Sequence, residues 1–157
     1  MNRSPVVVSA CLIGRRCRYN GEHRAHAGVL RYLKNKKYIA VCPEKLAGWG
    51  VPRPPVEFHG GGASAVVDGE AAIVDDRNRN RTASLLRGAR RALSRALAVK
   101  ATEAILKEKS PSCGVKKVYR DGRLVRGEGV FTHWLKRHGI ATRSEDSFTE
   151  RRATKQR

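Results

Sequence analysis

The sequence predicts a single α/β domain with a largely parallel sheet flanked by helices, as in a Rossmann-like fold. The chain has 157 residues, enough for one hydrophobic core. Short apolar runs of strand length alternate with segments of helical periodicity, an order typical of parallel sheets. We therefore expect one domain over residues 1–149, followed by a basic tail over residues 150–157 that frays in solution.

The first third of the chain predicts a strand, a helix and a second strand. Residues 6–11 are largely apolar and β-branched and break before Gly14, which is typical of a buried strand. Residues 27–36 predict a short helix with its apolar side chains on one face. Residues 38–42 predict the second buried strand, which Pro43 ends.

The middle of the chain predicts an ordered loop, a hairpin and a long helix. Residues 48–64 are so rich in proline and glycine that we expect a loop. Residues 65–67 and 71–74 flank Asp68-Gly69 and predict a small peripheral hairpin. Residues 82–100 predict a helix because apolar residues recur at helical spacing, with Thr82 as its N-cap.

The last third repeats the alternation of strand and helix. Residues 104–106 predict a strand that leads into a loop over residues 107–114. Residues 118–119 and 124–125 predict a second hairpin around Asp121-Gly122. Residues 130–138 predict a final helix ended by Gly139, followed by a strand over residues 140–143.

The charge of the chain is strongly positive, and this bears on its partners. It has 33 basic and 14 acidic residues, a net charge of +19, which favours polyanions such as nucleic acid. Arg87, Arg91 and Arg95 recur every four residues along the long helix and predict a phosphate-facing stripe. A solvated basic surface is the alternative explanation.

The sequence predicts a cytoplasmic protein with reduced cysteines. No run of about 18 apolar residues is present, so we expect no membrane span. The apolar start is interrupted by Cys11 and the Arg15–Arg16 pair, which makes it a poor signal peptide. Its four cysteines are therefore expected to be thiols or ligands rather than disulfides.

Three of these cysteines follow apolar, strand-like runs. Cys11, Cys42 and Cys113 lie far apart in the sequence, but the ends of neighbouring parallel strands meet at one crevice. Three thiolates there would suit a metal cluster. Cys17, between arginines in a polar loop, is expected to be exposed and idle, or a spare ligand.

Polar residues accompany two of these cysteines. Glu44 lies two residues after Cys42 and places a carboxylate beside a thiol. Ser110 and Ser112 precede Cys113 in the turn SPSCG, where backbone N–H groups can stabilise anionic sulfur.

Four segments together resemble the thiouracil desulfidase family: VSACLIGRRCRYNG, AVCPEKLAGWGVPRPPVEF, AILKEKSPSCG and GEGVFTHWLKRHGIATRSE. The resemblance implies an α/β domain in which three cysteines bind a [4Fe-4S] cluster with one open iron for the substrate's sulfur. By the resemblance the cluster ligands are Cys11, Cys42 and Cys113. Glu44 corresponds to the family's catalytic glutamate and Ser110 to its important serine, with Ser112 as the second candidate.

The resemblance implies a desulfidase that converts the thiocarbonyl of a thiolated pyrimidine to a carbonyl without redox chemistry and releases hydrosulfide. Free base or nucleoside is expected slightly ahead of thiouridine in tRNA, because a tRNA base must first be exposed. Two other hypotheses stay open. One is an RNA-binding module with zinc held by all four cysteines. The other is a cluster-bearing redox sensor without catalysis.

Overall fold

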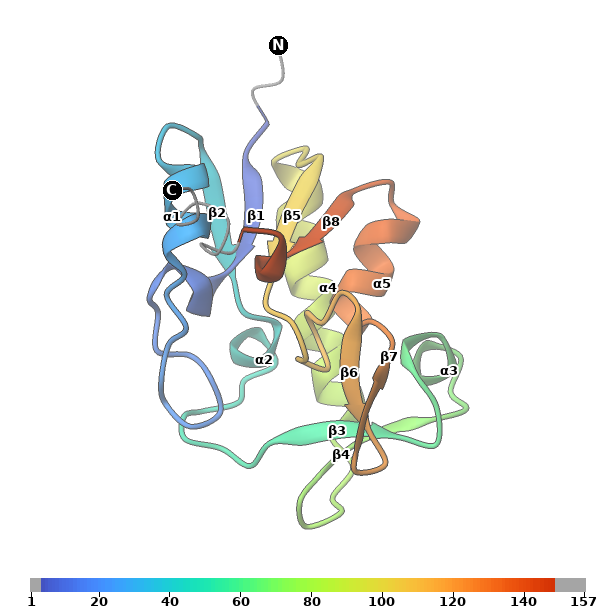
Figure 1. The fold of residues 1–157 in the computed structure, drawn as a ribbon. Helices are drawn as coiled ribbons and strands as arrows, with labels where there is room; N and C mark the ends of the chain where they lie inside the picture. Colours follow the sequence, from blue (N-terminus) through green and yellow to red (C-terminus); the bar gives the residue numbers. More distant parts are fainter. Residues whose placement is uncertain (1–3, 149–157) are drawn as a thin grey trace.

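A four-stranded parallel sheet forms the centre of the fold, as expected (Figure 1). The computed structural model describes residues 4–148, so the predicted tail at 150–157 lies outside the described residues. The strand order is β2-β1-β5-β8. The strands are β1 (Val6–Ser9), β2 (Tyr38–Val41), β5 (Glu103–Leu106) and β8 (Ala141–Ser144).

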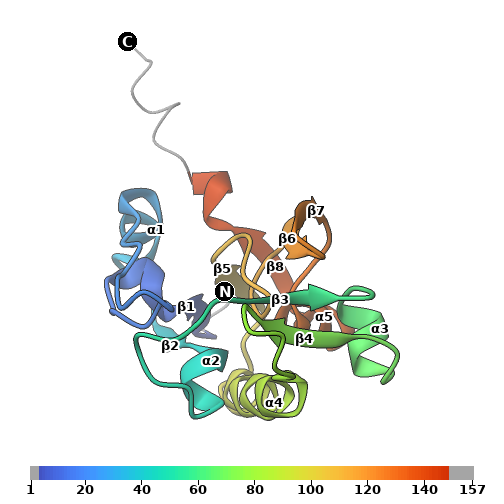
Figure 2. The same cartoon turned by 90° about the horizontal axis from the view of Figure 1, so that it is seen from below.

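Helices cover both faces of this sheet (Figure 2). Side chains of neighbouring strand residues point to opposite faces. Val7 therefore packs in the core beneath α4 (Thr82–Ala98) and α5 (Val130–Arg137). Val8 packs on the other face with α1 (Ala27–Leu33) and the 3-10 helix η2 (Glu145–Phe148). Both valines are fully buried, which stabilises the fold by about 1.5–3 kcal/mol each.

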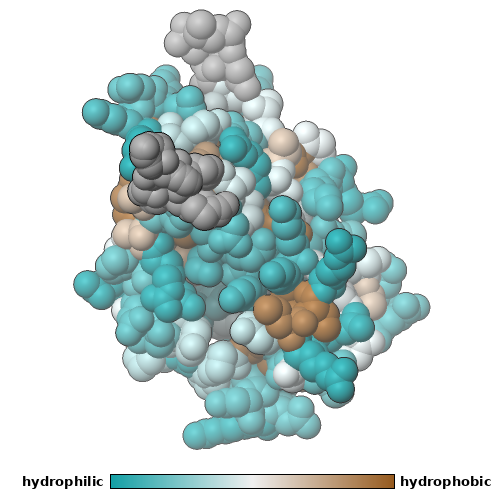
Figure 3. Space-filling model, in the orientation of Figure 1, coloured by the Kyte–Doolittle hydropathy of each residue, from teal (hydrophilic) through white to brown (hydrophobic). Residues whose placement is uncertain are grey.

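A second, mixed sheet lies beside the first in the order β4-β3-β6-β7. Its strands are β3 (Val56–His59), β4 (Ala72–Asp75), β6 (Lys117–Arg120) and β7 (Arg123–Arg126). Strands β6 and β7 form the hairpin predicted around Asp121-Gly122, and both of these residues have positive φ. In Figure 3 a hydrophobic patch lies over this hairpin, and β7 carries Leu124, which is exposed.

The hairpin predicted over residues 65–67 and 71–74 was wrong. Ala63 and Val66 are both buried, one helical turn apart, and this burial favours the helix α3 (Ala63–Val67) over a strand. Strand β4 pairs antiparallel with β3, which forms within the segment predicted to be a loop. The prolines end at Pro55, immediately before β3, so they do not interrupt its hydrogen bonding.

Two predictions of where an element begins or ends also need correction. The long helix has Arg81 at its N-cap, while the Thr82 hydroxyl accepts a 2.8 Å hydrogen bond from Ile73 N–H in β4. The strand predicted over residues 6–11 ends at Ser9, and a 3-10 helix, η1 (Ala10–Ile13), follows it and ends at Gly14 with a positive φ. A tertiary contact explains why Thr82 is not the N-cap, because its hydroxyl instead joins β4 to α4.

The longest helix, α4, has 17 residues. No helix in the described part of the chain is long and apolar enough to cross a bilayer.

The strand order creates a crevice between β1 and β5. The chain moves from β1 to one neighbour, β2, and returns later to β5 on the other side of β1. Ligands of α/β proteins bind at such a switch point, outside the carboxyl ends of the strands. Helix α2 (Pro43–Leu46), which the sequence did not predict, begins there directly after β2, with proline in its first turn.

Two glycines allow helices to approach the backbone around this crevice. A Cβ on Gly88 of α4 would overlap the carbonyl oxygen of Pro43 in α2. A Cβ on Gly129, just before α5, would overlap the backbone of Ser112. The backbone of α2 therefore packs directly against α4, and the backbone at Ser112 packs directly against the start of α5.

Candidate active site

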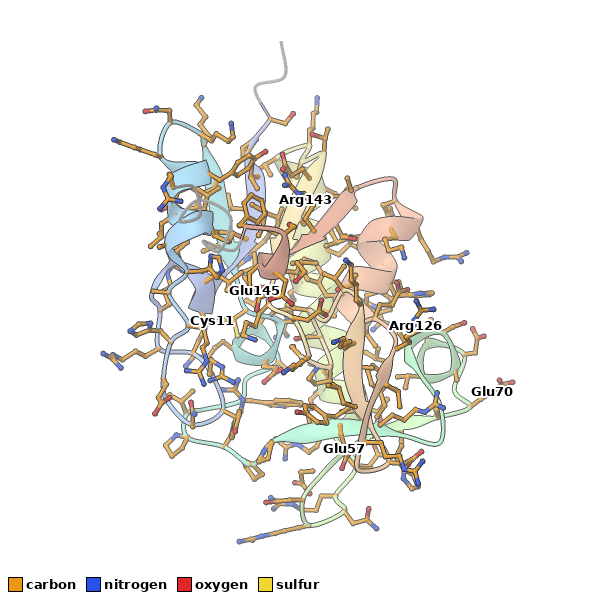
Figure 4. All side chains as sticks on the ribbon, in the orientation of Figure 1. Cys11, Glu57, Glu70, Arg126, Arg143 and Glu145 are labelled. Atoms are coloured by element: carbon orange, nitrogen blue, oxygen red, sulfur yellow. The ribbon has the colours of Figure 1, made fainter. Side chains whose placement is uncertain are left out.

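One cavity of about 410 Å³ opens at the carboxyl ends of β1, β2 and β5. Figure 4 labels Cys11 where β1 gives way to η1. The cavity brings together every site residue that the sequence predicted: Cys11, Cys42, Glu44, Ser110, Ser112 and Cys113. Residues separated by about a hundred positions thus lie around one space, because parallel strands end at the same sheet edge.

The cavity also contains Cys17, which corrects the expectation that this residue is exposed. Cys17 is 8% exposed, and the Cys42 thiol lies 3.9 Å from its carbonyl oxygen. Arg53 also donates to that carbonyl, at 2.8 Å. The polar loop therefore folds inward at Cys17, and all four thiols are free and line the same cavity.

Three of the thiols are held in their neutral form when no metal is bound. A hydrogen bond with Cys11 is the main cause that raises the pKa of Cys17, to about 11. A hydrogen bond with Cys17, followed by burial, raises the pKa of Cys42 far above its usual range. Burial raises the pKa of Cys113 to about 12. Metal ligation requires thiolates, so binding of a metal here would release protons.

Glu44 lies in the first turn of α2 and forms a buried ion pair. Its Oε1 accepts hydrogen bonds from Arg53 Nη2 at 2.6 Å and Nε at 3.1 Å. The side chains of Arg53 and Glu44 are only 6% and 14% exposed. The second oxygen, Oε2, lies 3.5 Å from the Ser112 hydroxyl.

The SPSCG turn is organised by Ser110. Its Oγ accepts hydrogen bonds from the backbone N–H groups of Ser112 and Cys113, both at 3.1 Å. The Ser112 hydroxyl is buried and lies 3.7 Å from the Cys113 sulfur. Ser110 therefore shapes the turn, while Ser112 lies between a carboxylate and a thiol.

A buried carboxylate, Glu108, holds the segment that directly follows this turn. Its Oε1 accepts hydrogen bonds from the backbone N–H groups of Val115 at 2.7 Å, Lys116 at 2.9 Å and Lys117 at 3.2 Å. Burial alone would raise the pKa of Glu108, but these donors outweigh burial and lower it. The Glu108 N–H in turn donates to Glu145 Oε1 at 2.7 Å.

Comparison with known proteins shows the family of this chain. Residues 6–147 match the model of a family described as 2-thiouracil desulfurase. This chain belongs to the 2-thiouracil desulfurase family. A Bacillus subtilis (strain 168) relative described as uncharacterized protein YbbK is 37% identical over 148 residues, covering 92% of this chain and 98% of that protein.

A solved structure extends the comparison to three dimensions. It is described as the [4Fe-4S]-dependent thiouracil desulfidase TudS, and it is 37% identical to this chain with a TM-score of 0.79. The match covers 92% of both chains. The α/β fold of this desulfurase family member is therefore shared with an enzyme of known structure.

Sequence reasoning missed two residues that line this cavity, Arg53 and Glu108. Arg53 stands in the PRPP segment and Glu108 in the segment before SPSCG, but no spacing rule links either residue to its partners. The sequence gives one signal for Glu108: together with Lys107 it directly follows an apolar strand. A charged residue at the end of a buried strand is seldom buried without a partner.

The arginine stripe lies apart from this cavity. Arg87, Arg91 and Arg95 lie on α4, and none of them lines the cavity. Arg91 Nη1 donates to the carbonyl of Leu46 at 2.6 Å and thereby joins α4 to α2. Arg87 and Arg95 are thus the two arginines of the stripe best placed for an external partner, while Arg91 has a structural contact.

Proposed function

We propose that this chain is a [4Fe-4S]-dependent desulfidase that converts the thiocarbonyl of a thiolated pyrimidine to a carbonyl. The observation that carries the proposal is one cavity lined by thiols, the Glu44 carboxylate and two serine hydroxyls. The reaction consumes one water and releases hydrogen sulfide or hydrosulfide. Carbon keeps its oxidation state, so no electron donor or acceptor is needed.

The donor set fits an iron–sulfur cluster. Thiolates are the ligands that such clusters use, and we assign Cys11, Cys42 and Cys113 as the three that would hold it. Within residues 4–148 no three Cys, His, Asp or Glu side chains are close enough to share one metal ion. The thiols instead surround a cavity, an arrangement suited to a group of several irons. When bound, the cluster would supply an iron with a free position, a Lewis acid toward soft sulfur.

The remaining chemistry falls to residues of the chain. Glu44 is the general base in this proposal: it takes a proton from the water that attacks the thiocarbonyl carbon and returns it to the departing sulfur. It then takes the proton of the new hydroxyl as the carbonyl forms, and this second proton leaves with the sulfide or passes to solvent. Ser110 keeps the SPSCG turn in shape through its two N–H contacts. Ser112 lies beside Glu44 Oε2 and can donate a hydrogen bond to water or substrate there.

A pyrimidine substrate with polar groups on its ring suits the polar lining of the cavity. Arg18 lines it, and its Nη1 is buried without a hydrogen-bond partner among the described residues. Such a donor suits an acceptor on the substrate, such as the carbonyl oxygen of a pyrimidine. Free base or nucleoside remains our first choice. Thiouridine in tRNA is the finer alternative that the arginines of α4 favour.

Anaerobic reconstitution tests the proposal directly. Iron and acid-labile sulfide are measured on the purified chain, and the loss of thiouracil absorbance is then followed. We expect about four irons per chain, with turnover that Glu44→Gln lowers about 10³-fold while iron is retained. Iron without turnover would instead favour a redox sensor.

A structural zinc held by four cysteines is the second candidate, because Cys17 is buried beside the other thiols. Zinc would require the four sulfurs to move to about 2.3 Å from one ion, because no three of these side chains share a metal position within residues 4–148. A colourless protein that binds zinc, loses it on Cys17→Ser substitution and consumes no thiouracil would support this alternative.

A further inference from the structure

We propose that Arg53 is a positioning residue that fixes the Glu44 carboxylate for proton transfer, a role that rests on the proposed desulfidase function. The contact between the two residues is asymmetric. Arg53 Nε and Nη2 both donate to Oε1 of Glu44, at 3.1 and 2.6 Å. This oxygen is occupied, so Oε2 is the oxygen left to exchange a proton with water.

The guanidinium is itself held in place by two loops. Arg53 Nη1 donates to the carbonyl of Gly50 at 3.0 Å, and Nη2 donates to the carbonyl of Cys17 at 2.8 Å. Pro52 and Pro54 flank Arg53 and restrict its backbone. The side chain therefore has partners in three segments: α2, the loop around Cys17 and the loop around Gly50.

Burial makes this contact stronger than a surface ion pair. The two side chains are 6% and 14% exposed, so water and salt screen them weakly. Glu44 Oε2 meets Ser112 at 3.5 Å, a long hydrogen bond that cannot by itself hold the carboxylate. The position of Glu44 thus depends chiefly on Arg53.

The planar fork of arginine matters as well as its charge. Arg53 uses three nitrogens on three acceptors, a pattern that a lysine ammonium cannot reproduce from one point. Arg53→Lys keeps the charge beside Glu44 and loses the fork. Arg53→Met removes both and keeps an unbranched apolar stem.

The test compares steady-state kinetics and structure in reconstituted full-length protein. We expect Arg53→Met to lower kcat about 10²-fold and to change KM less than about threefold. We expect Arg53→Lys to fall between the wild type and Arg53→Met. Added guanidinium should restore part of the kcat of Arg53→Met. A crystal structure of Arg53→Met should show the Glu44 carboxylate in more than one orientation.

A double variant separates positioning from a general structural role. If Arg53 acts through Glu44, then Arg53→Met in the Glu44→Gln background should change kcat less than about twofold. Arg79→Met is the matched control, because Arg79 binds the buried Asp75 at 2.8 Å and neither residue lines the cavity. This control should keep the wild-type kcat. Iron per chain and circular dichroism are measured for every variant.

The outcomes distinguish this role from the proposed function. An active wild type with an unchanged kcat in Arg53→Met would overturn the role of Arg53 alone. Losses that multiply in the double variant, or a Glu44 carboxylate that stays in place, would overturn it too. A loss of kcat that merely follows loss of iron would do the same. A wild type that holds its cluster and consumes no thiopyrimidine would overturn the desulfidase function and the role of Arg53 with it.

Discussion

The hydroxyl oxygens of Ser110 and Ser112 lie 2.9 Å apart and share a hydrogen bond. Their surroundings differ, because Ser110 Oγ is committed to two backbone N–H groups whereas Ser112 Oγ faces Glu44 Oε2. Two nearby serines therefore have separate tasks, one in the shape of the turn and one beside the carboxylate.

This difference predicts distinct effects of alanine substitution. Ser110→Ala leaves two N–H groups of the turn unpaired, so we expect less iron per chain and a free energy of unfolding lower by about 1–2 kcal/mol. Ser112→Ala should keep its iron and lose kcat about tenfold, a modest effect for a proton-transfer partner. Iron analysis and kinetics check both. Equal losses of iron in the two variants would contradict the separate tasks.

The cysteines give a second prediction. Serine at Cys11, Cys42 or Cys113 should prevent assembly of the cluster, measured as iron, sulfide and visible absorbance after anaerobic reconstitution. Cys17→Ser is the matched control, since Cys17 lines the same cavity and is buried like Cys11. It should retain at least most of the iron. An equal loss in Cys17→Ser would show that four cysteines, not three, bind the metal.

Glu108 predicts a pH-dependent stability. Its folded pKa is lowered, so its contribution is fully present above the unfolded pKa, about 4.3. That contribution is lost as the pH falls through the folded pKa. Glu108→Gln should lower the free energy of unfolding of the metal-free protein by about 1–3 kcal/mol at pH 7, and the difference should shrink in acid.

Chemical denaturation between pH 7 and pH 3 measures this difference. Glu22→Gln is the control, because the ion pair between Glu22 and Arg24 is exposed and 3.5 Å long. It should change stability by less than about 0.5 kcal/mol. A Glu108→Gln deficit that stays constant with pH would mean that packing, not charge, is the cause.

Gly88 predicts that the spacing of α2 and α4 controls the site. Gly88→Ala would press against the backbone of α2, which carries Glu44, so we expect a lower kcat and a destabilisation of about 1–3 kcal/mol. Gly62→Ala is the control, because a Cβ there meets no atom within 4 Å. Thermal unfolding and kinetics of the two variants are compared. Wild-type behaviour of Gly88→Ala would show that α2 moves aside freely.

The arginine stripe predicts salt-dependent binding of tRNA. Replacing Arg87 and Arg95 by glutamine should weaken binding and reduce the salt slope by about one for each phosphate that the variant no longer binds. Arg91 is left intact because it binds the carbonyl of Leu46. Arg123 and Arg126 on β7 provide a control with equal loss of charge. Equal weakening in both variants would mean that net charge, not the stripe, attracts the RNA.

The alternation of apolar runs and helical periodicity predicted the central sheet correctly, since buried strands and amphipathic helices carry their pattern locally. Strands β1, β2, β5 and β8 lie within about two residues of their predicted bounds. Pattern could not predict β3 or α3, because short segments take the structure that their neighbours impose: β3 pairs with β4, and Val66 joins the core.

The candidate site, too, could be predicted only in part from the sequence. The convergence of Cys11, Cys42 and Cys113 could be predicted from strand ends alone. The inward turn of Cys17 could not, because the loop that carries it is polar and its burial depends on contacts with Cys42 and Arg53. The partnership of Arg53 with Glu44 likewise arises only when two loops fold onto α2.

The position of β5 between β1 and β8 has a consequence for the order of events during synthesis. Cys11 and Cys42 leave the ribosome early, but Cys113 follows β5, which needs both neighbours to be secured. The second of these neighbours, β8, is complete only at Ser144. The three thiols that we assign to the cluster would therefore come together only after residues well beyond Cys113 have emerged, and a cluster held by them would assemble after the parallel sheet.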